Sequence, residues 1–182
     1  MAAGLHSLPS ATQGLSATQA AYRFLSNQRI GLPALMEPLL QAAEQGAATC
    51  EEWLLVVHDW CNLHYDKHLE KKDRTSLSNH WDLGYRLQAT LLLSDRGGEP
   101  IAPLSLSLEA ADGVHCSRSN RVRQPQSQLD ELEPVMRFID RRRWEKPAVH
   151  IVDAQADSVG LLRHWQAIGQ HFLVRSDAIR IV

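Results

Sequence analysis

The chain has 182 residues, 44% of them hydrophobic and 22% charged, and a formal net charge of −2. This length allows one ordinary domain, or a domain with a small appendage, around a single sizeable core. The composition is that of a soluble globular protein, and no apolar run approaches the roughly 20 residues that a membrane-spanning helix needs. Proteins that grip DNA over a large surface are usually basic, so any nucleic-acid surface must be local or lie outside this chain.

The N-terminus and the cysteines point to a cytoplasmic protein. The first ten residues lack the basic start and the sustained apolar stretch of a secretory signal. Cys50, Cys61 and Cys116 are widely spaced. An odd number of cysteines without a Cys-x-x-Cys pair predicts neither a disulfide framework nor a thiol-rich metal site.

Two helices are expected at the start of the chain, after a loose arm of small and polar residues. Residues 16–19, Ser-Ala-Thr-Gln, fit a capping box that begins the first helix. A second helix fits residues 33–45, with proline in its first turn and Gly46 as its stop. We therefore predict an N-terminal helical region over residues 1–48 and a core over residues 49–182.

Strands follow. Residues 53–59, Trp-Leu-Leu-Val-Val-His-Asp, read as a strand buried on both faces that delivers an aspartate to its end. Residues 66–82 are dense in mixed charge and predict a solvated loop. Residues 83–94 and 101–108 predict a hairpin around the turn sequence Asp-Arg-Gly-Gly. In its second strand leucines alternate with Ser105 and Ser107, which indicates an edge strand with the serines on the wetter face.

The last third of the chain alternates helix and strand. Residues 113–127 are rich in serine and arginine and are interpreted as a mobile basic loop. A capping-like Ser-Gln-Leu-Asp then begins a helix that ends in three arginines. A buried strand over residues 148–152 precedes Asp153, and a further helix leads to a final strand at residues 172–175.

This order predicts an α/β fold, with an antiparallel hairpin first and crossover connections after it. It matches an RNase H-like mixed sheet with helices, preceded by the small N-terminal helical region. Open α/β sheets bind ligands at the carboxyl ends of their strands, so Asp59 and Asp153 are candidates for a shared site. Paired carboxylates suit Mg²⁺, and two such ions support nuclease and strand-transfer chemistry. An aspartate after a strand is also often a helix cap.

The sequence resembles the DDE transposases of bacterial insertion sequences at three places. Residues 152–157, followed by the Phe-Leu-Val-Arg-Ser of residues 172–176, resemble the signature around the family's second aspartate. Residues 56–60, Val-Val-His-Asp-Trp, look like the segment around the first aspartate. Residues 20–27, Ala-Ala-Tyr-Arg-Phe-Leu-Ser-Asn, resemble a segment of the family's N-terminal helical region. The three matches occur in the family's order over most of the chain.

The resemblance implies that Asp59 and Asp153 are the first two catalytic acids and bind Mg²⁺ or Mn²⁺. The family's third acid, a glutamate, lies in a later Tyr-x-x-Arg-x-x-x-Glu motif, so we expect a C-terminally truncated protein with an incomplete core and little or no activity alone. The complete enzyme would cut transposon ends and join them to target DNA as a dimer. The implied partners are DNA, a second copy or a full-length transposase, with no membrane, in the cytoplasm near the nucleoid.

Four arginines are candidate DNA contacts. Arg175 is implied by the family's Val-Arg-Ser match. Arg141, Arg142 and Arg143 end a helix, where they complement its dipole or meet phosphates. After Asp153, Gln155 and Ala156 replace the family's usual Arg-Glu, which puts a phosphate contact from that arginine in doubt.

Other interpretations stay open. A non-catalytic DNA-binding or dimer-poisoning regulator, a relic without function, and a two-carboxylate nuclease unrelated to transposition all fit the same residues. Cys61, His64 and His68 have a zinc-like spacing without a convincing fourth ligand. His58 and His150 alternate with the aspartates and are expected to be packed. The five tryptophans are expected to anchor packing, and none is assigned to base stacking.

Overall fold

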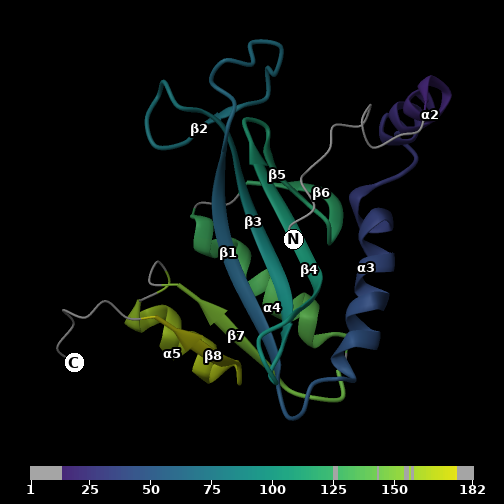
Figure 1. Ribbon diagram of the computed structural model, residues 1–182. Coiled ribbons are helices and arrows are strands. Elements are labelled where there is room, and N and C mark those ends of the chain that lie inside the picture. Colours follow the sequence, from purple (N-terminus) through teal and green to yellow (C-terminus); the bar gives the residue numbers. More distant parts are fainter. Residues whose placement is uncertain (1–13, 125–126, 143, 154–155, 157, 176–182) are drawn as a thin grey trace.

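The computed structural model describes residues 14–124, 127–142, 144–153, 156 and 158–175. In these ranges the chain forms one mixed eight-stranded sheet with helices against it (Figure 1). The helices are α2 (Leu15–Leu25), α3 (Leu32–Ala47), α4 (Leu132–Asp140), α5 (Val159–Ala167) and the short 3₁₀ helix η1 (Gln128–Glu131). The strands are β1 (Leu54–His64), β2 (Thr75–Ser76), β3 (Leu83–Ser94), β4 (Pro100–Ala110), β5 (Gly113–Cys116), β6 (Ser119–Arg123), β7 (Ala148–Val152) and β8 (His171–Val174).

The sheet combines an antiparallel half with a parallel half. Its strand order is β6-β5-β4-β3-β1-β7-β8, and β2 pairs with β3 outside this path. The strands β1, β3 and β4 pair antiparallel, whereas β7 and β8 run parallel to β1 after helical crossovers. The predicted α/β class is therefore confirmed, and the arrangement is consistent with an RNase H-like fold. None of the helices in the described ranges is long and apolar enough to cross a bilayer.

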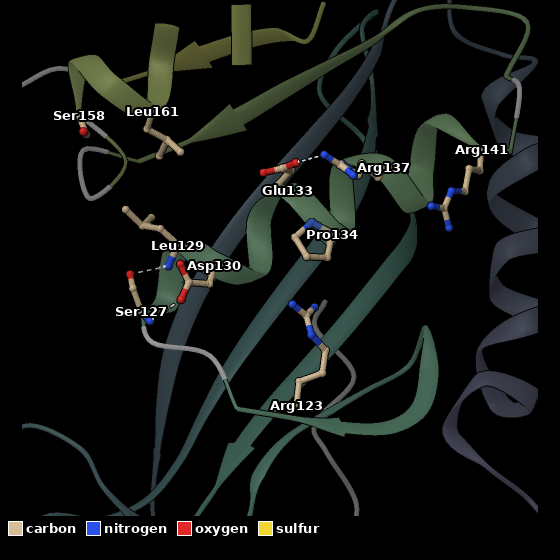
Figure 2. Close-up of a pocket in the computed structure, with 10 residues that line it drawn as sticks. All are labelled: Arg123, Ser127, Leu129, Asp130, Glu133, Pro134, Arg137, Arg141, Ser158 and Leu161. Carbon is tan, nitrogen blue, oxygen red and sulfur yellow. Dashed lines mark hydrogen bonds and ion pairs between the residues drawn. The ribbon is translucent and has the colours of Figure 1, made fainter. Parts of the chain in front are cut away.

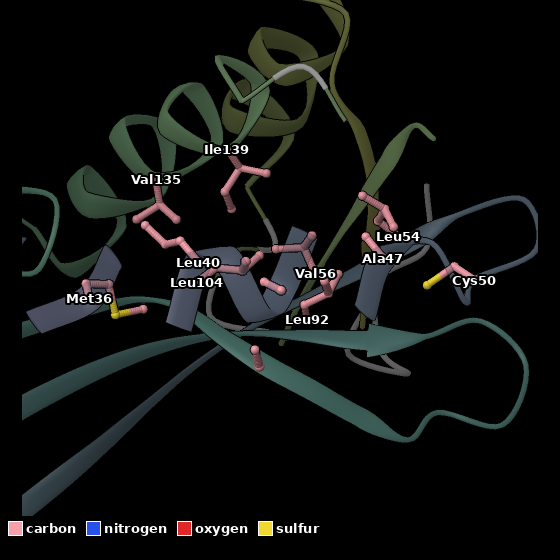
Figure 3. Packing of buried hydrophobic residues seen from close by; sticks show 12 residues of the cluster. Met36, Leu40, Ala47, Cys50, Leu54, Val56, Leu92, Leu104, Val135 and Ile139 are labelled. Atoms are coloured by element: carbon pink, nitrogen blue, oxygen red, sulfur yellow. The ribbon is translucent and has the colours of Figure 1, made fainter. Parts of the chain in front are cut away.

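The helices lie mainly on one side of the sheet. Helix α4 lies behind the sheet and α3 runs alongside β4 (Figure 1). Figure 3 shows Val135 and Ile139 of α4 pointing toward Leu40 of α3 and Val56 of β1, and all four are buried in one cluster. A second cluster joins α4 and α5 through the fully buried Trp165. We call this side the covered face and the opposite side the open face.

Burial along β1 alternates between these two faces. Leu54, Val56 and His58 are buried on the covered face, whereas Leu55 and Val57 on the open face are only half-buried. The prediction of a strand buried on both faces is therefore wrong in detail. The reason is that no helix of the described chain packs on the open face beside β1 and β7.

Two further sequence predictions are corrected. The segment predicted as a mobile basic loop forms the β5–β6 hairpin, which extends the sheet beyond β4. Leu104 is buried as predicted, but Ser105 and Ser107 are also buried and Leu106 is exposed, the reverse of the predicted orientation for these three residues. The cause is Arg118, whose guanidinium turns inward and donates to both serine hydroxyls (2.5 and 3.1 Å).

Local capping explains where several elements begin. Ser127 forms the predicted capping box: its Oγ accepts from Leu129 N, and Asp130 accepts from Ser127 N. Helix α2 instead begins at Leu15 without a side-chain cap, one residue before the predicted box. At the start of β1, the Asp95 carboxylate accepts three backbone N–H groups of residues 51–53 (2.7–2.9 Å), and these bonds lower the pKa of Asp95 to about 2.

Candidate functional site

Asp59 lies within β1, and Asp153 follows directly after β7, the parallel neighbour of β1. Strands β1 and β7 pair in register up to Val57 and Ile151. Asp59 and Asp153 each follow two residues later, beyond the last pair of this ladder. Because side chains alternate along a strand, Asp59 lies on the open face with Val57, and the same alternation predicts this face for Asp153. Asp59 is exposed and Asp153 is half-buried.

Arg175 continues the same row on the next strand. Val152 pairs with Val174 in the parallel β7–β8 ladder, and Arg175 N donates to Val152 O (3.2 Å). The register therefore sets Arg175 beside Asp153, and its side chain is exposed. Asp153 and Arg175 thus follow directly after the carboxyl ends of β7 and β8, in the half of the sheet that runs parallel to β1, the strand of Asp59. A phosphate group bridged to the carboxylates by cations would find a positive partner there.

A pair of buried histidines lies on the covered face, one residue before Asp59 and three before Asp153. His58 Nε2 and His150 Nδ1 are 2.9 Å apart, and His58 Nδ1 is 3.1 Å from Thr90 Oγ1. The side chains are almost fully buried, which confirms the prediction that they are packed. Burial keeps the pKa of His58 well below its usual value and lowers the pKa of His150 to about 4. The pair is thus neutral at pH 7 and links β3, β1 and β7 beneath the candidate site.

The arginines at the end of α4 differ from one another. Arg141 is exposed and lines a hollow of about 770 Å³. Arg142 bridges Glu37 (3.1 Å) and Glu44 (2.5 Å) of α3, so its guanidinium is already engaged in holding α3 against α4. Arg143 lies outside the described residues. Of the two described arginines, Arg141 is the more exposed and therefore the better placed for a phosphate.

The hollow beside Arg141 is basic and open. Figure 2 shows Arg123 of β6 and Arg141 on the same side of α4, with Ser127 and Ser158 at the other end of the hollow. Glu133 is neutralised within it by Arg137, four residues later on the helix. Neither Arg123 nor Arg137 was predicted as a DNA contact. Arg137 lies four residues before Arg141, on the same face of the helix, and this spacing is the signal that could have identified Arg137.

No alternative metal cluster accompanies these residues. Across the described ranges, no group of three or more His, Cys, Asp or Glu side chains is placed to hold a metal ion. His64, one member of the zinc-like spacing, lies 2.6 Å from the Asp82 carboxylate instead. Any metal held by Asp59 and Asp153 would therefore have two carboxylates as its protein ligands in this part of the chain.

Comparison with known families adds an observation from the other end of the chain. Residues 3–30 match a family model described as transposase DNA-binding. This match supports the interpretation of the chain as part of a transposase. It also supports DNA as the partner of the chain, and it overlaps the exposed helix α2. A search of curated proteins found no match.

Proposed function

We propose that the chain is the first part of the catalytic core of a DDE-type transposase, in which Asp59 and Asp153 hold divalent metal ions for DNA cleavage and strand transfer. The observation that supports this proposal is the parallel pairing of β1 and β7, whose last pair, Val57 and Ile151, lies two residues before each aspartate. The transposase DNA-binding match at residues 3–30 supplies the substrate class.

The donors fit Mg²⁺ or Mn²⁺. Both cations prefer carboxylate oxygens and keep several waters, and the exposed Asp59 leaves room for them. When bound, such ions activate a water or hydroxyl for attack on a phosphate and stabilise the leaving oxygen. Asp59 and Asp153 would hold the ions, and Arg175 in the same row would neutralise and orient the phosphate. The neutral histidine pair beneath would keep the two strands in register.

We propose that the chain alone has little or no cleavage activity. Two carboxylates give a divalent ion few protein ligands, and the described residues bring no third acid to the pair. A third acidic ligand, as in the DDE family, would be needed to fix both ions against the phosphate.

Metal binding tests the proposal directly. Titration of Mn²⁺ into the chain, followed by calorimetry, should show binding that falls about tenfold or more in both D59N and D153N, because each removes a charged ligand. The matched control is D66N, which removes an exposed carboxylate from the loop after β1 and should leave binding unchanged. Equal Mn²⁺ affinity in the wild type, D59N and D153N would refute the proposed site.

A second candidate is a non-catalytic regulator of transposition. The DNA-binding match favours it, because DNA occupation by residues 3–30 needs no metal chemistry. Co-expression with an active transposase of the same element separates a regulator from a relic without function. A regulator lowers transposition even when Asp59 and Asp153 are both changed to Asn, whereas a relic leaves it unchanged.

A further inference from the structure

Trp81 contradicts the expectation that every tryptophan anchors packing. Its exposure of 77% is greater than that of any other large hydrophobic side chain in the described chain. By contrast, Trp165 is fully buried, and Trp144 donates its ring N–H to Ile139 O (3.0 Å). A large exposed aromatic ring loses free energy to water unless a partner covers it.

The backbone beneath Trp81 is held by a closed turn. Asn79 Oδ1 accepts hydrogen bonds from Trp81 N (3.0 Å) and Asp82 N (3.1 Å), and Leu77 N donates to Asp82 O (2.9 Å). The Asp82 carboxylate in turn binds His64 Nδ1 (2.6 Å) at the end of β1. The turn is thus fastened to the sheet, so the indole is presented outward at a small further cost in conformational entropy.

The loop that carries Trp81 has charges of both signs. Two of its acids have partners within the protein, since Asp73 accepts from the Tyr85 hydroxyl (2.6 Å) and Asp82 binds His64. Lys67 and Lys72 are exposed in the same loop, as are Asp66 and Glu70. His80 packs against the indole, with ring centroids 4.1 Å apart, and most of the indole surface is left to solvent.

The segment between β1 and β3, which carries Trp81, projects beyond β1, the strand that carries Asp59 (Figure 1). Asp59 and His64 are five positions apart, which corresponds to roughly 17 Å along an extended strand. Stacked nucleotides in one strand of duplex DNA are about 3.4 Å apart, so this span equals about five stacked nucleotides. DNA lying over the aspartates and along β1 would meet Trp81 about five nucleotides away.

We propose that Trp81 stacks on an unpaired DNA base about five nucleotides from the phosphate at Asp59 and Asp153. This inference rests on the proposed function for its partner. Aromatic stacking suits a site that tolerates many sequences, because every base has a π-face, and exposed lysines attract the neighbouring phosphates.

Binding of a mixed-sequence single-stranded oligonucleotide to the full chain tests the inference. W81A should weaken binding about 5- to 150-fold, the range that base–aromatic stacking gives on alanine substitution. W81F should retain most of the affinity, and L69A is the matched control because Leu69 is 69% exposed in the same loop. The salt dependence of W81A binding should match that of the wild type, since stacking releases no counterions. Thermal unfolding followed by circular dichroism should be unchanged in both alanine variants.

Four outcomes would overturn the inference, each in a recognisable way. Equal affinity of W81A and wild type for single-stranded DNA refutes the stacking contact and leaves the proposed function standing. An equal loss in L69A shows a general surface effect. Loss of self-association in W81A with unchanged DNA affinity assigns the ring to a protein partner. If the wild type binds no DNA, the inference and its parent proposal fail together, and Mn²⁺ binding by the aspartates then decides whether the metal site survives.

Discussion

Single residues in this fold are constrained more by their neighbours across the sheet than by their neighbours in sequence. His58 and His150 show this, because 92 positions separate two rings that share a hydrogen bond. Strand periodicity was enough to predict that both rings point away from the aspartates. It could not predict their pairing, because that depends on the register between β1 and β7, which no local pattern encodes.

Lowering the pH should destabilise the folded protein through this histidine pair. In the unfolded chain a histidine gains its proton near pH 6.5, whereas burial delays protonation of His150 until about pH 4. Between these values the unfolded state binds more protons, so the free energy of unfolding should fall as the pH falls, by up to about 3 kcal/mol. Denaturant titrations at several pH values measure this slope. The H150Q variant should show a shallower slope, and parallel slopes would contradict the assignment.

At the scale of elements, the β5–β6 hairpin depends on one inward-facing arginine. The side chains of Arg118 and Glu131 are 6% and 5% exposed, and their ion pair of 2.7 Å joins the hairpin to η1. Arg123 Nη1 lies 3.1 Å from the second carboxylate oxygen, without the alignment of a hydrogen bond. Serine and arginine in this segment suggest a solvated loop, and the prediction failed because the acid that buries the arginine is distant in sequence.

Removing the Glu131 carboxylate should therefore lower the free energy of unfolding far more than removing a surface charge. E131Q leaves Arg118 buried without its partner and should destabilise the protein by roughly 3–5 kcal/mol. The double variant R118M/E131M replaces both charges by apolar groups and should recover most of that loss. Urea unfolding midpoints compare the two. If the double variant were less stable than E131Q, the cluster would owe its role to something other than charge pairing.

The whole molecule is built around a sheet with unequal faces. Two adjacent residues of β3 lie on different faces: Leu92 is fully buried on the covered face, and Leu93 is half-buried on the open face. Their partners across β1, Val56 and Leu55, follow the same division. Helix packing therefore stabilises one side of the fold, while the other side presents Asp59 to solvent.

This asymmetry predicts opposite tolerance at neighbouring positions. L92A should lose about 2–5 kcal/mol of stability, because it opens a cavity in a packed core. L93A should lose roughly 1 kcal/mol or less, because its side chain already meets water and little apolar area is re-exposed. Thermal or urea unfolding of the two variants provides the comparison. Similar losses would show that the open face is covered in solution.

Much of this architecture follows from local signals. The hairpin turn is predictable because Gly97 and Gly98 allow tight backbone geometry, and Gly98 indeed has a positive φ of 76°. The capping box at Ser127 is another local signal. The open face was missed because an apolar strand of Leu and Val looks the same whether one or both sides are packed. The exposure of Trp81 was missed because residue type alone favours burial.

The alternation of faces along β1 also sets which insertions and deletions the gene can tolerate. Deleting one residue within positions 54–58 would change the parity of the strand and turn Asp59 toward the covered face, among the packed helices. Deleting two would restore the face and shift the carboxylate by roughly 7 Å relative to Asp153. Loops such as residues 95–99 carry no such parity. In-frame insertions and deletions should therefore accumulate in the turns between strands and be absent from residues 54–58, which precede Asp59.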